Sequence, residues 1–105
     1  MFTSSLEERE LVIKLQGHLL VGIVPRLIKE TLNILESEAD NFDNVVLNMR
    51  RCLDIDSRGV SYIINLHKIL TLENKGLKLI DVQPDIYEVL SFVKIDKYLV
   101  INRGE

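Results

Sequence analysis

The segment Val45-Val46-Leu47 is an unbroken apolar run, and it follows the turn-forming residues 40–44. A short apolar run of this kind is typical of a strand that is buried on both faces at the centre of a sheet. Sheets with such strands are usually parallel and covered by helices. We therefore expect a strand from Val45 to Met49 at the centre of the sheet.

The preceding part of the chain contains two strand patterns and one helix pattern. In residues 11–17 the larger apolar side chains recur with a period of two, which predicts a strand with one buried face that ends at Gly17. The short polar segment 2–8 predicts a weak edge strand that pairs with it through a tight turn. Pro25 favours the first turn of a helix that we expect to run to about Ala39, with an apolar face formed by Leu27, Ile28, Thr31, Leu32 and Leu35.

The second half of the chain also alternates between helix patterns and strand patterns. A helix is expected after residue 57, with one apolar stripe formed by Val60, Ile63, Ile64, His67 and Leu70. Residues 77–80 predict the next strand, and residues 98–101 predict the last one. Between these two strands, Pro84 favours the start of a helix whose inward side chains are expected to be Ile86, Val89, Leu90 and Val93.

Strands that alternate with helices at this spacing imply right-handed crossovers between parallel strands. The sequence therefore predicts an α/β fold with a central, mostly parallel sheet of about five strands, an N-terminal edge strand and helices packed against the sheet. A chain of 105 residues is long enough for one domain and too short for two ordinary ones. We expect a single domain that covers residues 1–105.

Charge and cysteine content exclude several classes of function. Thirteen basic and sixteen acidic residues give a net charge of -3, and no basic run is longer than Arg50-Arg51, so a general nucleic-acid binder is not expected. The Arg50-Arg51 pair either contacts an acidic partner surface or is simply solvated. Cys52 is the single cysteine, and no cluster has metal-ligand spacing, so we expect a reducing cytoplasmic environment and neither a metal site nor a cofactor. No apolar run is long enough for insertion into a membrane.

The tetrapeptide Asp56-Ser57-Arg58-Gly59 lies between the central strand and the following helix. The first turn of a helix has unpaired backbone N–H groups and the positive end of the helix dipole, so it favours an oxyanion. Ser57 is thus a candidate phosphorylation site. In the alternative interpretation Ser57 only caps the helix.

The chain resembles the STAS domain family, in particular the small bacterial anti-sigma factor antagonists, over nearly its whole length. The resemblance rests on the order of the elements and on several short segments taken in register. These segments are 15–17, 45–48 leading into 56–60, 75–79, and 84–93 followed by 95–99. The loop usual in the family reads Asp-Ser-Ser-Gly, and Ser57 occupies the place of its first serine.

The resemblance implies a partner switch. In this family the unmodified antagonist binds a partner that is both anti-sigma factor and serine kinase, phosphorylation at the position of Ser57 ends the association, and a serine phosphatase restores it. The chain would then be a phosphoacceptor substrate and a binding module, not an enzyme. The residues implied in partner binding are His18, Leu19, Leu20, Asp54, Asp56, Arg58 and Gly59.

Two differences from the family keep a second function open. Arg58 replaces the second serine of the loop, and Leu20 stands where family members often have an acidic residue. The alternative is a STAS module that acts as a scaffold or as an accessory subunit of a transporter or signalling complex. Ser57 would then be unmodified, and the surface around Leu19 and Leu20 would bind the partner. These two leucines could equally fold back over the core.

Overall fold

The computed structural model describes residues 2–19 and 24–104 of the chain. The described residues form five strands, three α-helices and one short 3-10 helix. In chain order these elements are β1 (Phe2–Glu7), β2 (Glu10–Leu19), α1 (Val24–Ser37), β3 (Asn44–Ile55), α2 (Ser57–Leu72), β4 (Gly76–Val82), α3 (Pro84–Phe92), η1 (Ile95–Lys97) and β5 (Val100–Arg103).

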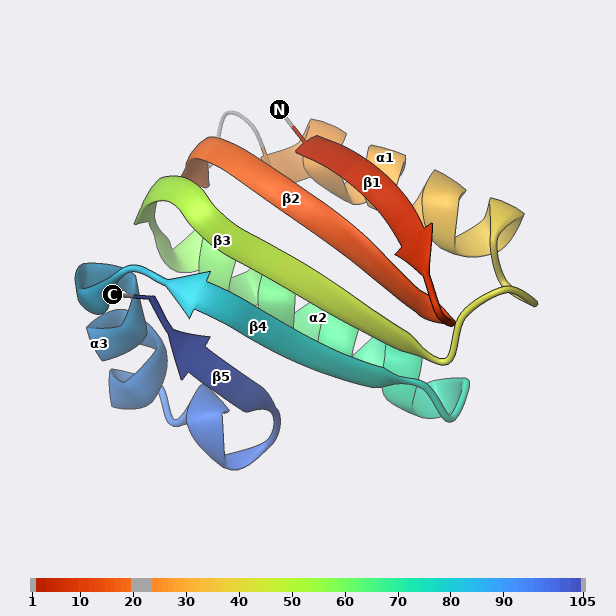
Figure 1. Cartoon of the computed structure of the whole chain (residues 1–105). Helices are drawn as coiled ribbons and strands as arrows, with labels where there is room; N and C mark the ends of the chain where they lie inside the picture. Colours follow the sequence, from red (N-terminus) through yellow and green to blue (C-terminus); the bar gives the residue numbers. More distant parts are fainter. Residues whose placement is uncertain (1, 20–23, 105) are drawn as a thin grey trace.

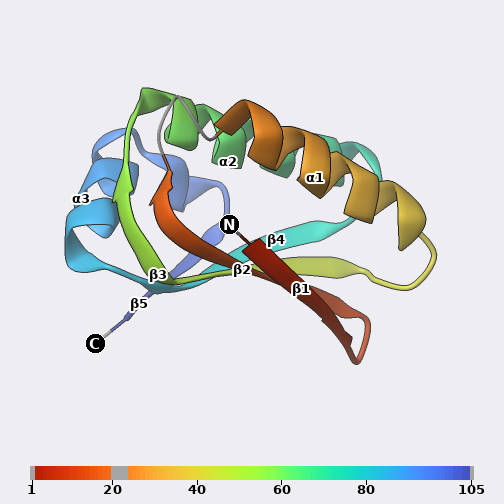
Figure 2. The ribbon, with the colours of Figure 1, turned by 90° about the horizontal axis from the view of Figure 1, so that it is seen from above.

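The five strands form one sheet in the order β1-β2-β3-β4-β5. Strand β1 is antiparallel to β2, and the remaining neighbours are parallel. The predicted fold class is therefore confirmed, with β3 at the centre and β1 at an edge. The helices lie on one side of the sheet, as the view along the layers shows (Figures 1 and 2).

The main core lies between the sheet and the helices. Side chains of three adjacent strands point into it, and they include Leu11, Ile13, Leu15, Val45, Leu47, Met49, Leu77, Leu79 and Val82. Val46 is also buried, although it is not part of this cluster. In register it lies between Val12 and Lys78 on the opposite face of the sheet. The central strand is thus buried on both faces, as its apolar run predicted.

Strands β2 and β3 are longer than expected, because each continues past an irregularity. Gly17 does not end β2, which extends to Leu19. Its φ of 87° is a conformation that glycine adopts without steric cost, and the pairing of β2 with β3 shifts register next to it. The sequence interpretation took this glycine for a strand end, whereas it allows the strand to bulge and continue. His18 is therefore a strand residue and not a loop residue.

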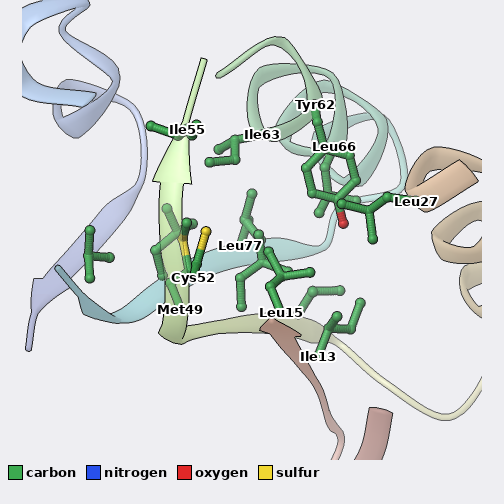
Figure 3. Close-up of a cluster of buried hydrophobic side chains, with 14 of the residues drawn as sticks. Ile13, Leu15, Leu27, Met49, Cys52, Ile55, Tyr62, Ile63, Leu66 and Leu77 are labelled. Carbon is green, nitrogen blue, oxygen red and sulfur yellow. The ribbon is translucent and has the colours of Figure 1, made fainter. Parts of the chain in front are cut away.

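Helices α1 and α2 pack against one another through a buried polar contact as well as apolar ones. The hydroxyls of Thr31 and Tyr62 lie 2.9 Å apart and share a hydrogen bond. Burial raises the pKa of Tyr62 to about 12, since the phenolate would lose its hydration there. Figure 3 shows Tyr62 and Leu66 of α2 next to Leu27 of α1. Neither Tyr62 nor Leu66 was among the predicted inward residues, although both are buried.

Some predicted inward residues lie at the surface. Leu32 of α1 is 42% exposed and Val89 of α3 is 39% exposed. Val93 is 46% exposed and follows the end of α3 at Phe92. Helix α3 is short and buries only Ile86 and Leu90, because it covers the outer part of the sheet near β5. The last strand begins at Val100 and not at residue 98, since residues 98 and 99 form a turn and bend after the 3-10 helix η1.

The two-residue turn between β1 and β2 is fastened to the rest of the molecule. Its central residues Glu8 and Arg9 both have positive φ, as in the type I′ turns of tight hairpins. The Arg9 guanidinium donates hydrogen bonds to both carboxylate oxygens of Asp43, at 2.8 and 3.0 Å. The Asp43 N–H in turn donates to the Arg9 carbonyl oxygen at 2.9 Å. This contact joins the hairpin to the segment that precedes β3.

Candidate functional site

Strand β3 passes into α2 at one end of the sheet (Figure 1), and Ser57 lies at this junction. It is the first residue of α2, and its side chain is exposed. Only Asp56 separates it from Ile55, the last residue of β3. The hydroxyl is therefore accessible from solvent, as the candidate phosphorylation site requires.

The cap of helix α2 is Asp56 and not Ser57. Asp56 has extended backbone dihedrals, and its Oδ1 accepts hydrogen bonds from the N–H groups of Arg58 at 2.9 Å and Gly59 at 3.0 Å. Its carbonyl oxygen accepts from the Val60 N–H at 3.0 Å. The interpretation in which Ser57 caps the helix is thus wrong, because the carboxylate of the preceding residue performs this role.

The cap also changes the electrostatics of the first turn. The Asp56 carboxylate already brings negative charge to the positive end of α2 and occupies two of its N–H donors. A phosphate on Ser57 would compete with this carboxylate for the same donors. The nearest cationic side chain in sequence is Arg58, which is exposed. These groups determine how the site would accommodate an added anion.

The core beneath the site holds the end of β3 in place. Ile55 and Cys52 are buried, and Ile55 faces Ile63 of α2 in the same cluster (Figure 3). The Cys52 thiol donates to the Asp54 carbonyl oxygen at 3.5 Å. A buried cysteine of this kind behaves as a small apolar side chain of the core. The exposed Ser57 is thus carried on a rigid base.

The ends of β2 and β3 bring several of the predicted partner-binding residues to one end of the sheet. His18 pairs with Asp54, and Leu19 pairs with Ile55, in the parallel register of the two strands. The Asp54 carboxylate is exposed and accepts a hydrogen bond from the Ile55 N–H at 2.8 Å. Leu20 lies outside the described residues.

The predicted site residues on α2 differ in accessibility. Arg58 is exposed, Asp56 is half-buried, and Gly59 is buried within the first turn. A partner that approaches Ser57 would therefore meet the side chains of Asp56 and Arg58 first. Gly59 contributes its N–H group to the cap.

Metal-binding clusters and membrane-spanning helices are both absent from the described residues. Within residues 2–19 and 24–104, no three or more His, Cys, Asp and Glu side chains are grouped so as to hold a metal ion. No helix formed by these residues is both long and apolar enough to cross a bilayer.

Three solved proteins illustrate the structural similarity. SpoIIAA, an anti-sigma factor antagonist, matches in its unphosphorylated form with a TM-score of 0.74 and 20% identity, over 96% of this chain and 86% of that one. The phosphorylated form of SpoIIAA from Bacillus matches with a TM-score of 0.73 and 18% identity, over 96% and 90% of the two chains. At such identities the similarity demonstrates a shared fold.

The other two proteins are a second anti-sigma factor antagonist and a protein of the sulfate transporter family. An anti-sigma factor antagonist from Mycobacterium paratuberculosis has a TM-score of 0.85 and 14% identity, over 97% of this chain and 84% of that one. A sulfate transporter family protein from Wolinella succinogenes has a TM-score of 0.77 and 19% identity, over 93% and 80%. Comparison with curated protein sequences gave no significant match.

Comparison with protein families gave a match to the STAS domain over residues 4–104. This match covers all five strands and all three helices except for the first residues of β1. It agrees with the resemblance seen in the short segments around residues 15–17 and 56–60. The chain therefore belongs to the STAS domain family.

Proposed function

We propose that this STAS domain is an anti-sigma factor antagonist that works by partner switching. In its unmodified form it binds an anti-sigma factor that is also a serine kinase, and phosphorylation of Ser57 releases it. A serine phosphatase reverses the modification. The observation that carries the proposal is the exposed Ser57 hydroxyl on the first turn of α2, next to an aspartate that already caps the helix.

The cap gives the switch a physical basis. Phosphorylation adds about 1.5 to 2 negative charges. A phosphate on Ser57 would place this charge beside the Asp56 carboxylate. The phosphate and the carboxylate would then compete for the N–H groups of Arg58 and Gly59. The free protein can relieve the repulsion through solvent and through the Arg58 guanidinium. Against a docked partner, the phosphate must also lose water, which costs on the order of a few kcal/mol.

That cost is sufficient for a switch. A change of about 1.4 kcal/mol in binding free energy alters affinity tenfold, so a penalty of about twice that value separates bound from free protein. The partner surface in this proposal is the end of the sheet that carries Ser57. Its members are His18, Leu19, Leu20, Asp54, Asp56, Arg58 and Gly59. In this role the chain is a cytoplasmic substrate and binding module and performs no catalysis.

Mass spectrometry after incubation with the cognate anti-sigma kinase and ATP tests the proposal. We expect one phosphate per chain, located on Ser57, and none on the Ser57→Ala variant. Ser61→Ala is the matched control, because Ser61 is exposed on the same helix one turn later. It should be modified as efficiently as the unaltered protein. Modification that persists in Ser57→Ala would contradict the proposal.

Binding measurements test the switch itself. Ser57→Asp should weaken the complex with the unmodified kinase at least tenfold, whereas Ser61→Asp should change it little. Arg58→Ser restores the loop usual in the family, and it should strengthen the effect of phosphorylation, because it removes the cation beside the phosphate.

The second candidate function is an unphosphorylated scaffold or accessory subunit of a transporter or signalling complex. The shared fold with a sulfate transporter family protein favours it. In that role Ser57→Asp would leave partner binding intact, whereas Leu20→Asp would reduce it. The two functions thus predict opposite results for Ser57→Asp, which should weaken binding in the partner switch and leave it intact in the scaffold.

A further inference from the structure

A hollow lies beside the carboxyl ends of β4 and β5, and none of its lining residues belongs to the Ser57 loop. It encloses about 690 Å³ and is lined by Arg50, Arg51, Asp81, Gln83, Arg103 and Gly104. These residues come from three neighbouring strands of the sheet or directly follow them. In parallel sheets, the region outside the carboxyl ends of the strands is where ligands commonly bind.

The hollow forms because β3 and β4 separate. Their pairing extends only to Asn48 and Ile80, and the next residue of β4, Asp81, has a φ of 54°. The Gln83 side chain then bridges the two strands by donating a hydrogen bond to the Arg50 carbonyl oxygen at 2.7 Å. The gap between the strands is thus fixed at both ends.

An irregularity in β3 places two consecutive arginines at the surface. Lys14 of β2 pairs with Asn48, but Gln16 pairs with Arg51, so β3 has one extra residue between these pairs. In a regular strand successive side chains point to opposite faces, whereas Arg50 and Arg51 are both exposed. Bulges of this kind often redirect side chains next to functional sites.

The cations of the hollow are not neutralised within the described part of the chain. No carboxylate there forms a salt bridge with Arg50, Arg51 or Arg103, in contrast to Arg9 and Arg26, which pair with acidic residues. Three arginines and one aspartate give the lining a formal charge of 3 - 1 = +2, although the whole chain carries -3. The hollow is therefore a concentrated positive region on an acidic protein.

Two contacts organise the side of the hollow formed by β5. The Arg103 guanidinium lies over the Tyr87 ring, 5.1 Å from its centre. The Gly104 N–H donates to the Val82 carbonyl oxygen at 2.9 Å, and a Cβ at Gly104 would come within about 3.1 Å of the Asp81 backbone. A glycine at this position thus lets the two chain segments approach closely.

We propose that this hollow binds a small molecule that carries two or more phosphate groups. Guanidinium groups form paired hydrogen bonds with phosphate oxygens, and three of them from two strands suit more than one phosphate. The volume lies within the range of about 300 to 1,000 Å³ that is usual for small-molecule sites. The site uses none of the residues around Ser57 and is independent of the proposed partner switch.

An NMR titration of the ¹⁵N-labelled chain with pyrophosphate tests the proposal. We expect saturable shifts of the backbone N–H signals of Arg51, Gln83 and Gly104. The triple variant R50Q/R51Q/R103Q should weaken the binding at least tenfold. All three arginines are exposed, so the fold should persist, and the dispersion of the remaining signals checks it.

A charge-matched control distinguishes a specific binding site from general electrostatic attraction of pyrophosphate to the protein. The triple variant K29Q/K68Q/K97Q removes three exposed cations that do not line the hollow, and it should bind pyrophosphate within about twofold of the unaltered chain. Shifts that do not saturate, or equal weakening in both triple variants, would overturn the proposal. Equal affinity for citrate would overturn the assignment to phosphate. Ser57→Ala should bind pyrophosphate normally, so failure of the switch and failure of this site are distinguishable.

Discussion

Helices α2 and α3 both follow a parallel strand and cover the same side of the sheet, but they begin differently. Helix α2 is capped by Asp56, whose carboxylate accepts from two N–H groups of the first turn. Helix α3 begins at Pro84, and the residue before it, Gln83, makes no side-chain cap. Its amide instead reaches β3.

The two helices also differ in how deeply they are anchored. Helix α3 buries only two residues, Ile86 and Leu90. Helix α2 buries six, which are Gly59, Val60, Tyr62, Ile63, Leu66 and Leu70. Phe92 at the end of α3 is 86% exposed. The candidate phosphorylation site thus stands on the firmly anchored helix, and the arginine-lined hollow stands next to the weakly anchored one. In the proposed switch, this anchoring would hold the Ser57 hydroxyl in one position for the kinase.

Truncating a buried side chain of α2 should give the largest difference between the helices. Leu66→Ala should destabilise the protein by about 2 to 5 kcal/mol, because it leaves a cavity against α1. Val89→Ala on α3 is the control, and with a side chain already 39% exposed it should cost less than about 1 kcal/mol. Urea unfolding followed by circular dichroism measures both. Equal losses would show that α3 is anchored as firmly as α2.

Alkaline titration should reveal the buried tyrosine of α2. Tyr62 has a pKa of about 12 in the folded state, above the value of 10.0 for a free side chain. The folded protein therefore holds this proton more tightly than the unfolded chain, and the stabilisation is complete below pH 10 and lost as pH rises toward 12. Two pKa units correspond to at most about 2.7 kcal/mol.

The slope of stability against pH between these limits is the measurement. Tyr62→Phe should flatten it, because this variant removes the buried phenol group. An unchanged slope in Tyr62→Phe would show that this tyrosine is not the source of the pH dependence.

Removing the cap should weaken α2 more than the corresponding change weakens α3. Asp56→Ala should cost about 1 kcal/mol, because the Arg58 and Gly59 N–H groups lose their acceptor. Gln83→Ala removes one exposed hydrogen bond to β3, and we expect a loss of about 0.5 kcal/mol. Thermal unfolding of the two variants compares them, and a larger loss for Gln83→Ala would reverse their order.

The smallest effect is expected for Ser57→Pro, which gives α2 the same first residue as α3. Proline suits the first helical position, and Asp56 already has the extended backbone that a residue before proline prefers. Stability should change by no more than about 0.5 kcal/mol, measured by urea unfolding, although the proposed phosphoacceptor is gone. Arg58→Pro is the control and should cost clearly more, because it removes an N–H group that Asp56 binds.

Several parts of this molecule could be predicted from the sequence because their causes are local. The apolar run at Val45 and the periodicity of the neighbouring segments were sufficient for the order of strands and helices. The position of Ser57 at a helix start also followed from local signals. The sequence did not settle which residue caps the helix, since Asp56 and Ser57 are both good caps.

Other features depend on contacts between distant segments. Gly17 indicated a strand end, whereas pairing with β3 carries β2 through a bulge. The Arg50-Arg51 pair was visible in the sequence, but Arg103 joins it only because β5 lies beside β4. The burial of Tyr62 likewise depends on Thr31 of α1, 31 positions earlier in the chain.

The contact between Arg9 and Asp43 has a consequence for how the molecule avoids self-association. Strand β1 covers one side of β2, whose backbone would otherwise offer a template for pairing by a foreign strand. The hydrogen bond from Arg9 lowers the pKa of Asp43. The ion pair between the two side chains therefore weakens when acid protonates the Asp43 carboxylate. Acidification should therefore loosen the turn of the hairpin, while the backbone pairing of β1 with β2 continues to cover this edge of β2.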